Sequence, residues 1–103
     1  MRKRKSLDRK EKKLVVIKTD GSIDEFIMDK APELKRLQEI VGGYIEVVPV
    51  LYGGNHVQMI VDDEGLVKQK SINEKATDIY RRTRDGFPLI AGDVAILVGL
   101  KLE

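Results

Sequence analysis

Residues 32–52 read PELKRLQEIVGGYIEVVPVLY, and the hydrophobic period changes inside this stretch. Apolar residues first recur three and four positions apart, which is the spacing of one face of an α-helix. Pro32 suits the first turn of a helix, where backbone N–H groups have no acceptor within the helix, and Gly42 can adopt the left-handed conformation that ends one. The sequence therefore predicts an amphipathic helix that begins at Pro32, followed by a strand over residues 44–52.

A β-hairpin is predicted before this helix. An apolar run over residues 14–17 is followed by Asp20-Gly21, a pair that offers the positive φ angles of a tight turn. The return strand, residues 22–28, mixes apolar and acidic side chains in a broken alternation, which indicates either a solvent-facing side or a bulge.

A second hairpin is predicted after the helix. The strand over residues 44–52 turns at Gly53-Gly54 and returns over residues 56–61, where apolar side chains alternate. Pro49 cannot donate to a ladder, so the first of these strands is expected to lie at an edge of the sheet or to carry a bulge there.

The rest of the chain predicts one more helix and one more strand. Residues 71–82 fit a short helix capped by Ser71 or Asn73, and the uninterrupted apolar run 94–98 fits a strand buried on both faces near the middle of the sheet. A chain of 103 residues can bury one modest core. The expected fold is a single small α+β domain with a mostly antiparallel or mixed sheet of about five strands and two helices, in the order ββαββαβ.

Charge is distributed unevenly along the chain. Residues 2–13 hold eight basic and two acidic side chains, a net charge of +6, whereas residues 14–103 hold 11 basic and 15 acidic side chains, a net charge of −4. We therefore expect a flexible basic arm over residues 1–13 and the α+β domain over residues 14–103. The candidate nucleic-acid contacts in the arm are Arg2, Lys3, Arg4 and Lys5. The alternative is a basic end that is merely solvated.

Several classes of function are excluded or disfavoured. The chain contains no cysteine, which excludes a disulfide framework, a thiolate nucleophile and a cysteine metal site. Its charged start lacks the apolar part of a signal peptide, and no apolar run is long enough to cross a bilayer, so we expect a cytoplasmic protein. His56 is the only histidine, and the acids at residues 62–64 that would complete a cation site with it are typical turn residues beside a glycine. We expect no catalytic residue, no metal and no cofactor.

Four segments, in order along the chain, resemble a known family. They are Leu37–Glu46, Asp63–Leu66, Asn73–Thr77 and Ile90–Val94, which read LQEIVGGYIE, DEGL, NEKAT and IAGDV. The resemblance is to a small phage- and mobile-element-associated domain of unassigned function (family 3846 of the unassigned domains), and it spans roughly residues 14–100. It implies a protein of a phage, a plasmid or another mobile element, or of its host, and it implies no catalytic residue.

Asn73, Thr77 and Arg81 are candidates for a ligand site. Their spacing of four residues on the predicted helix places them on one face, where amide, hydroxyl and guanidinium groups suit a phosphate or a carboxylate. The alternative is that Asn73 and Thr77 form a helix cap and a surface stripe and bond to their own backbone.

Residues 80–87 place three arginines between two aromatic side chains. The arginines are Arg81, Arg82 and Arg84, and the aromatic residues are Tyr80 and Phe87. Such a segment can neutralise phosphates and stack on exposed bases. In the alternative, both aromatic side chains pack on the core while the arginines pair with the excess acid of the domain.

Three functions are expected from these observations. The first is a non-catalytic binding protein that engages an anionic partner, with nucleic acid as the first candidate, through the basic arm and the arginine segment. The second is a protein–protein interaction module or inhibitor of a host protein that uses an exposed sheet edge or the apolar side of a hairpin. The third is a binder of a small anionic, nucleotide-like ligand at Asn73, Thr77 and Arg81. The sequence predicts no oligomeric state.

Overall fold

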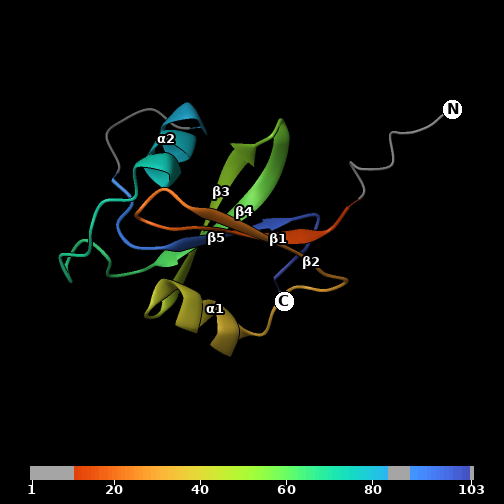
Figure 1. Cartoon of the computed structure of the whole chain (residues 1–103), viewed down its shortest axis with the longest axis horizontal. Coiled ribbons are helices and arrows are strands. Elements are labelled where there is room, and N and C mark those ends of the chain that lie inside the picture. Colours follow the sequence, from red (N-terminus) through yellow and green to blue (C-terminus); the bar gives the residue numbers. More distant parts are fainter. Residues whose placement is uncertain (1–10, 84–88, 103) are drawn as a thin grey trace, which may run out of the picture.

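The computed structural model describes residues 11–83 and 89–102, and within these residues the chain forms one antiparallel sheet with a helix on each face (Figure 1). The elements follow one another as β1 (Lys13–Ile17), β2 (Ile23–Ile27), α1 (Leu34–Val41), β3 (Ile45–Tyr52), β4 (Asn55–Asp62), α2 (Glu74–Thr83) and β5 (Val94–Val98). The structure therefore confirms the predicted α+β domain and its ββαββαβ order.

The strand order explains which strands are buried. Across the described part of the chain the order is β2-β1-β5-β4-β3, and every neighbouring pair is antiparallel. β5 lies at the centre with four of its five residues buried, as the apolar run 94–98 predicts. β3 lies at one edge, as Pro49 predicts. β2 forms the other edge, and all five of its residues are exposed.

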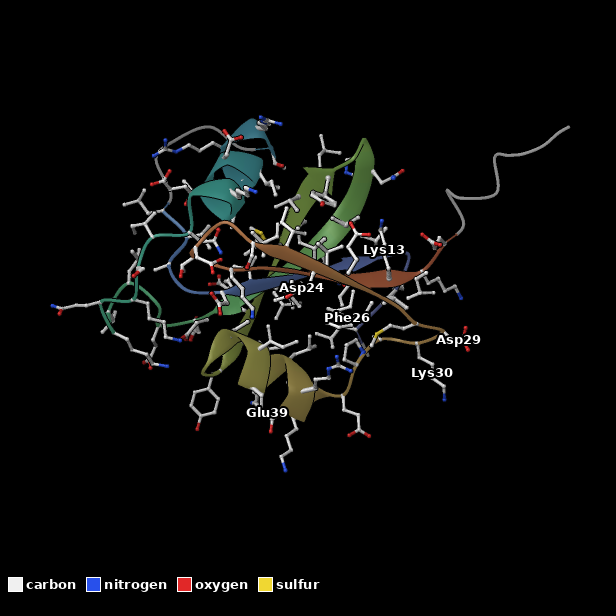
Figure 2. The ribbon with its side chains drawn as sticks, viewed as in Figure 1. Lys13, Asp24, Phe26, Asp29, Lys30 and Glu39 are labelled. Carbon is white, nitrogen blue, oxygen red and sulfur yellow. The ribbon has the colours of Figure 1, made fainter. Side chains whose placement is uncertain are left out.

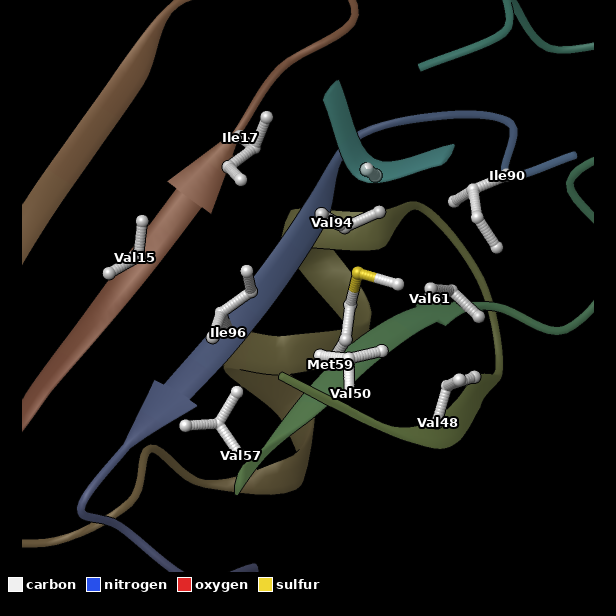
Figure 3. Packing of buried hydrophobic residues seen from close by; sticks show 11 residues of the cluster. Val15, Ile17, Val48, Val50, Val57, Met59, Val61, Ile90, Val94 and Ile96 are labelled. Carbon is white, nitrogen blue, oxygen red and sulfur yellow. The ribbon is translucent and has the colours of Figure 1, made fainter. Parts of the chain in front are cut away.

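Two apolar layers form because side chains on a strand alternate between the faces of the sheet. On β1, Val15 and Ile17 belong to the layer that includes α2, whereas Leu14 and Val16 belong to the layer that includes α1. Figure 3 shows the first layer, with Met59 of β4 packed among valines and isoleucines of the neighbouring strands. The sheet is therefore the shared wall of two small cores.

The first hairpin turns where the sequence predicts. Gly21 has a φ angle of +92°, and Oδ1 of Asp20 accepts the N–H of Ser22 at 2.8 Å. The register between β1 and β2 runs without interruption from one end of the strands to the other. The broken alternation of β2 therefore reflects an exposed edge strand, and the bulge that we considered there is wrong.

Helix α1 ends where predicted but begins later. Gly42 has a φ angle of +82°, and its N–H donates to the carbonyl oxygen of Gln38 at 2.7 Å. At the other end Glu33 keeps an extended backbone, with φ −67° and ψ 155°, so the first helical residue is Leu34. Pro32 therefore precedes the helix and does not lie in its first turn.

Helix α2 also begins later than predicted, at Glu74, because the cap is Asn73 and not Ser71. Ala76 is buried against the sheet, and Ile79 and Tyr80 pack beside it partly exposed. The two helices have eight and 10 residues. Among the residues that the structure describes, no helix is long and apolar enough to span a membrane.

Candidate interaction surfaces

Asn73, the first predicted ligand residue, is fully buried. Its Oδ1 accepts the N–H of Ala76 at 3.1 Å, which caps α2. Its Nδ2 donates to the carbonyl oxygen of Ile17 at 2.9 Å and to that of Gly92 at 3.0 Å. The amide therefore ties the start of α2 to the end of β1 and to the segment that leads into β5.

Thr77, the second predicted ligand residue, is also buried. Its hydroxyl accepts the N–H of Ile90 at 2.9 Å and lies 3.4 Å from the carbonyl oxygen of the same residue. Both backbone groups of Ile90 are thus bonded to one side chain. Because Asn73 is shielded from solvent and bonded internally, the geometry favours the cap alternative over direct ligand contact by Asn73. Thr77 does not form the surface stripe of that alternative, since it is buried and bonds Ile90 outside its own helix.

Thr77 and Arg81 do lie together, since both line an open hollow of about 530 Å³ on one side of α2. Lys75 lines it as well, but so do the carboxylates of Glu74 and Asp78. The hollow thus carries two cationic and two anionic side chains, and its charges offset one another.

In the described half of the arginine segment, residues 80–83, Tyr80 packs on the core and Arg82 pairs with an acidic side chain. This is the alternative to nucleic-acid contact that the sequence left open. Nη2 of Arg82 lies 2.8 Å from Oδ2 of Asp78, and the two side chains are 74% and 60% exposed. An ion pair this exposed contributes about 0–1 kcal/mol. Tyr80 packs on the apolar layer beneath α2.

The remaining predicted contacts lie outside the described residues. They are Arg2, Lys3, Arg4 and Lys5 of the arm and Arg84 of the arginine segment. Strand β1 begins at Lys13, one residue before the expected start of the domain.

The outer side of β2 presents backbone groups to solvent. The N–H of Met28 donates to the carbonyl oxygen of Lys12 at 3.0 Å, which fixes the phase of the ladder between β2 and β1. Antiparallel bonds alternate along a strand, so Ile23, Glu25 and Ile27 direct their N–H and C=O groups away from β1. Within residues 11–83 and 89–102, no strand pairs with this side of β2.

The side chains of β2 point to both faces of the sheet. Figure 2 shows Asp24 and Phe26 on the side of α1 and Lys13 of β1 on the other side. The Arg36 guanidinium of α1 lies 5.5 Å from the centre of the Phe26 ring, a cation–π contact. On the opposite face Ile23 and Ile27 are 41% and 75% exposed.

Asp62, at the end of β4, is a fully buried carboxylate. Nζ of Lys70 lies 2.5 Å from its Oδ2, and Nζ of Lys68 lies 3.1 Å from the same oxygen. Its Oδ1 accepts the N–H of Glu64 at 2.9 Å. The buried charge is therefore paired twice and hydrogen-bonded by the backbone of the turn that follows it.

The two lysines also bind the end of helix α1. Nζ of Lys70 donates to the carbonyl oxygen of Val41 at 2.7 Å. The ammonium groups of Lys68 and Lys70 both lie within 3.3 Å of the carbonyl oxygen of Gly42. Cations are favourable at this end of a helix, where backbone carbonyls have no partner within the helix. A Cβ atom on Gly43 would meet Nζ of Lys68 and lie 2.8 Å from Oδ1 of Asp62, so a larger residue here would have to displace this ion pair.

The pKa of Asp62 reflects a competition. Burial on its own would raise the pKa, but the hydrogen bonds from Lys70, from the Glu64 N–H and from Lys68 outweigh it and lower the pKa from 3.8 to about 2. Since one pKa unit corresponds to about 1.4 kcal/mol, the ionised carboxylate stabilises the fold by on the order of 2 kcal/mol at neutral pH.

His56 does not approach the acidic turn with which a cation site was considered. His56 lies at the start of β4 and Asp62 is the last residue of the same strand, and six strand residues span about 20 Å. In the part of the chain that the structure describes, no group of three or more histidine, aspartate or glutamate side chains is placed to hold a metal ion.

The described fold and surfaces define a small α+β domain in which Asp62 and Asn73 anchor the turns at one end of the sheet. The chain belongs to the family described as "Domain of unknown function (DUF3846)", whose model matches residues 10–101. The match contains all four segments that carry the resemblance and begins inside the expected arm. No curated protein and no solved structure matches the chain.

We predict that Asn73 stabilises the fold. Asn73→Ala would remove the side-chain donor to the buried carbonyls of Ile17 and Gly92 together with the cap of α2, and it should lower the free energy of unfolding by at least ~2 kcal/mol. Urea unfolding measures the change. Ser71→Ala, at the other cap position considered, is the control and should shift stability by less than ~0.5 kcal/mol. Wild-type stability of Asn73→Ala would contradict the prediction.

We predict that Asp62→Asn removes a pH-dependent stabilisation. The folded pKa of about 2 lies below the unfolded value of 3.8, so the contribution is complete well above the unfolded pKa and is lost as the pH falls toward the folded one. Urea unfolding at neutral pH should separate wild type from variant by on the order of 2 kcal/mol or more, and the gap should narrow below about pH 4.

Asp63→Asn is the matched control, because Asp63 is an exposed residue of the same turn. It should leave stability nearly unchanged at neutral pH. If the gap between wild type and Asp62→Asn kept its full size at about pH 2, the ionised pair would not be its source.

Proposed function

We propose that the chain is a non-catalytic binding protein that engages a partner protein by adding a strand of the partner to β2. The observation that carries this proposal is the open edge of β2, where Ile23, Glu25 and Ile27 direct backbone donors and acceptors to solvent. An extended peptide that pairs with such an edge gains main-chain hydrogen bonds, and neighbouring side chains supply specificity.

The opposite edge of the sheet is less able to accept a strand. Pro49 in the middle of β3 has no N–H to donate. The N–H of Leu51 is bonded to Oγ1 of Thr83, at the end of α2, at 3.0 Å. Among the residues that the structure describes, β2 contains no proline and none of its outward N–H groups is bonded to a side chain. Of the two edges, β2 is therefore the one that can accept a partner strand.

The side chains of β2 favour a foreign strand over a second copy of β2. Glu25 pairs with Lys13 at 3.1 Å, and Asp24 lies 3.9 Å from Lys18. If two β2 strands paired antiparallel about Glu25, the two glutamates would face each other, which is unfavourable. A partner strand that places apolar side chains near Ile23 and Ile27 avoids that repulsion. The family resemblance leads us to propose a host protein as this partner.

We predict that Glu25→Pro blocks binding without unfolding the domain. Proline removes only the outward N–H at this position and is tolerated on edge strands. A partner protein retained from nuclease-treated host lysate by the wild type should be retained at least about tenfold less by the variant, a difference of about 1.4 kcal/mol. Hydrogen exchange on the wild-type complex should show new protection at the amides of Ile23, Glu25 and Ile27.

Glu25→Ala is the matched control, because it loses the same carboxylate but keeps the N–H. The two variants should differ in stability by no more than ~1 kcal/mol, the span of strand propensities. Equal retention of the partner by Glu25→Pro and Glu25→Ala would exclude strand addition at β2, as would a wild type that retains no protein.

An anionic partner, with nucleic acid first, is the second candidate. The observation that favours it is the net charge of +6 over residues 2–13, opposite in sign to the −4 of residues 14–103. Lys101 adds a cation near the end of β5, where β1 also begins. A small nucleotide-like ligand beside Thr77 and Arg81 has less support, because carboxylates offset the cations of that hollow.

For this second candidate we predict salt-sensitive binding that depends on the arm. A band-shift series should show binding at low salt that weakens steeply, since each phosphate contact contributes about −0.9 to the slope of log K against log salt. Deletion of residues 1–10 leaves β1 intact and should abolish the shift. A salt-insensitive shift, or one that survives the deletion, would rule out the arm as a polyanion contact.

A further inference from the structure

A separate hollow of about 230 Å³ opens where the turn after β4 meets the segment that leads into β5. Its apolar lining consists of Val61, Leu66, Val67, Leu89, Ile90 and Ala91. Leu66, Val67 and Leu89 are 53%, 81% and 42% exposed, so they form the accessible walls, whereas Ile90 is buried beneath them. This surface is independent of the β2 edge.

Two exposed carboxylates, Glu46 and Asp63, also line this hollow. A third lining residue, Asp62, is already paired with two lysines. Among the lining residues that the structure describes, none is basic. An apolar hollow with anionic groups at its rim complements a side chain that has an aliphatic stem and a cationic head.

The wall of the hollow is held in place before any partner arrives. The N–H of Gly65 donates to the carbonyl oxygen of Asp62 at 3.2 Å, and the N–H of Lys70 donates to that of Gly65 at 3.1 Å. A Cβ atom on Gly65 would lie 2.6 Å from the carbonyl oxygen of Ala91, so the two walls are in close contact. Binding to a preformed surface loses little conformational entropy.

The same turn contains backbone strain. Gln69 has a φ angle of +61°, in the left-handed region that residues other than glycine rarely occupy. Strained backbone of this kind persists where the surrounding contacts determine it, here the bonds of Lys68 and Lys70 to Asp62. Leu66 and Val67 are thus presented to solvent by a turn that is hydrogen-bonded internally at Gly65 and Lys70.

We propose that this hollow binds a lysine or arginine side chain from a basic peptide segment of a partner protein. The aliphatic stem packs between Leu66 and Leu89, and the cationic head pairs with Glu46 and Asp63. The charge of the rim argues against a polyanion at this place, since nucleic acid would meet two carboxylates. A free polyamine shares the cationic chemistry and is separated from a peptide by the experiment.

The experiment uses the full chain with methyl groups observed by NMR. The probe is the peptide Gly-Leu-Arg-Leu-Gly, and the matched probe replaces arginine with neutral citrulline. The arginine peptide should shift the methyl signals of Leu66, Val67 and Leu89 in a saturable way, and the citrulline peptide should bind at least about fivefold more weakly. Raised salt should weaken only the arginine peptide.

The double variant Glu46→Gln/Asp63→Asn tests the rim and should weaken the arginine peptide at least about fivefold. Its matched control is Glu33→Gln/Glu39→Gln, which removes the same net charge from two exposed positions. Glu33 directly precedes α1, and Glu39 lies within it. An equal effect of both double variants would overturn the proposal, because only overall charge would then matter. The proposal would also be overturned if the arginine and citrulline peptides bound equally well, or if millimolar peptide shifted no methyl signal. It would likewise be overturned if spermine shifted the methyl signals as much as the arginine peptide does.

Discussion

The buried charge of Asp62 is the constraint around which one end of the sheet is organised. A carboxylate removed from water must be compensated by partners, and here both lysines come from the turn that follows β4. Those lysines also bind carbonyls at the end of α1. A side chain at Gly43 would have to displace this ion pair. One ionised group therefore joins a helix end, a strand end and a turn, and that turn also forms one wall of the neighbouring hollow.

Asn73 has the corresponding role on the other face of the sheet. Its amide bonds to β1 and to the approach to β5, and its Oδ1 caps α2. Asp62 thus joins the first two of the four segments that carry the family resemblance, through Gly43 and Glu64, and Asn73 joins the last two, through Gly92. This placement gives the motif a structural explanation: its glycines allow close approach, and its polar residues satisfy buried backbone groups.

Most of the fold could be predicted from the sequence, because periodicity reports which faces are buried. The central position of residues 94–98 and the edge position of Pro49 were both correct for that reason. The start of α1 was wrong, since proline at 32 fits the residues just before a helix as well as its first turn. The Asp62 cluster was missed and interpreted as an ordinary turn. The lysine partners of Asp62 follow it by six and eight residues, but the carbonyl groups that these lysines bind lie about 20 residues before Asp62 in the sequence. No local sequence pattern connects the lysines with those carbonyl groups.

The predicted ligand residues show how a correct spacing can lead to a different role. Thr77 and Arg81 share one side of α2, as expected, but the buried backbone of Ile90 needed the threonine hydroxyl. Sequence spacing places residues on a helix face, whereas burial decides whether they contact solvent or the core. The hollow beside Leu66 was not predicted for a related reason, since its walls come from β3, from the end of β4 and the turn after it, and from residues 89–91.

The open edge of β2 and the hollow are compatible with a single partner. The outward backbone groups of β2 belong to residues whose side chains lie on the α2 face, and Val61 and Ile90 in the hollow belong to the layer on that same face. A strand added outside β2 and strand β3, which carries Glu46, are five strand spacings apart, on the order of 24 Å. About seven extended residues cover that distance, so a partner paired along β2 needs a linker of at least that length to place a cationic side chain at Glu46 and Asp63. Two weak contacts on one partner reinforce each other through effective concentration, which makes the separation of the sites part of the specificity.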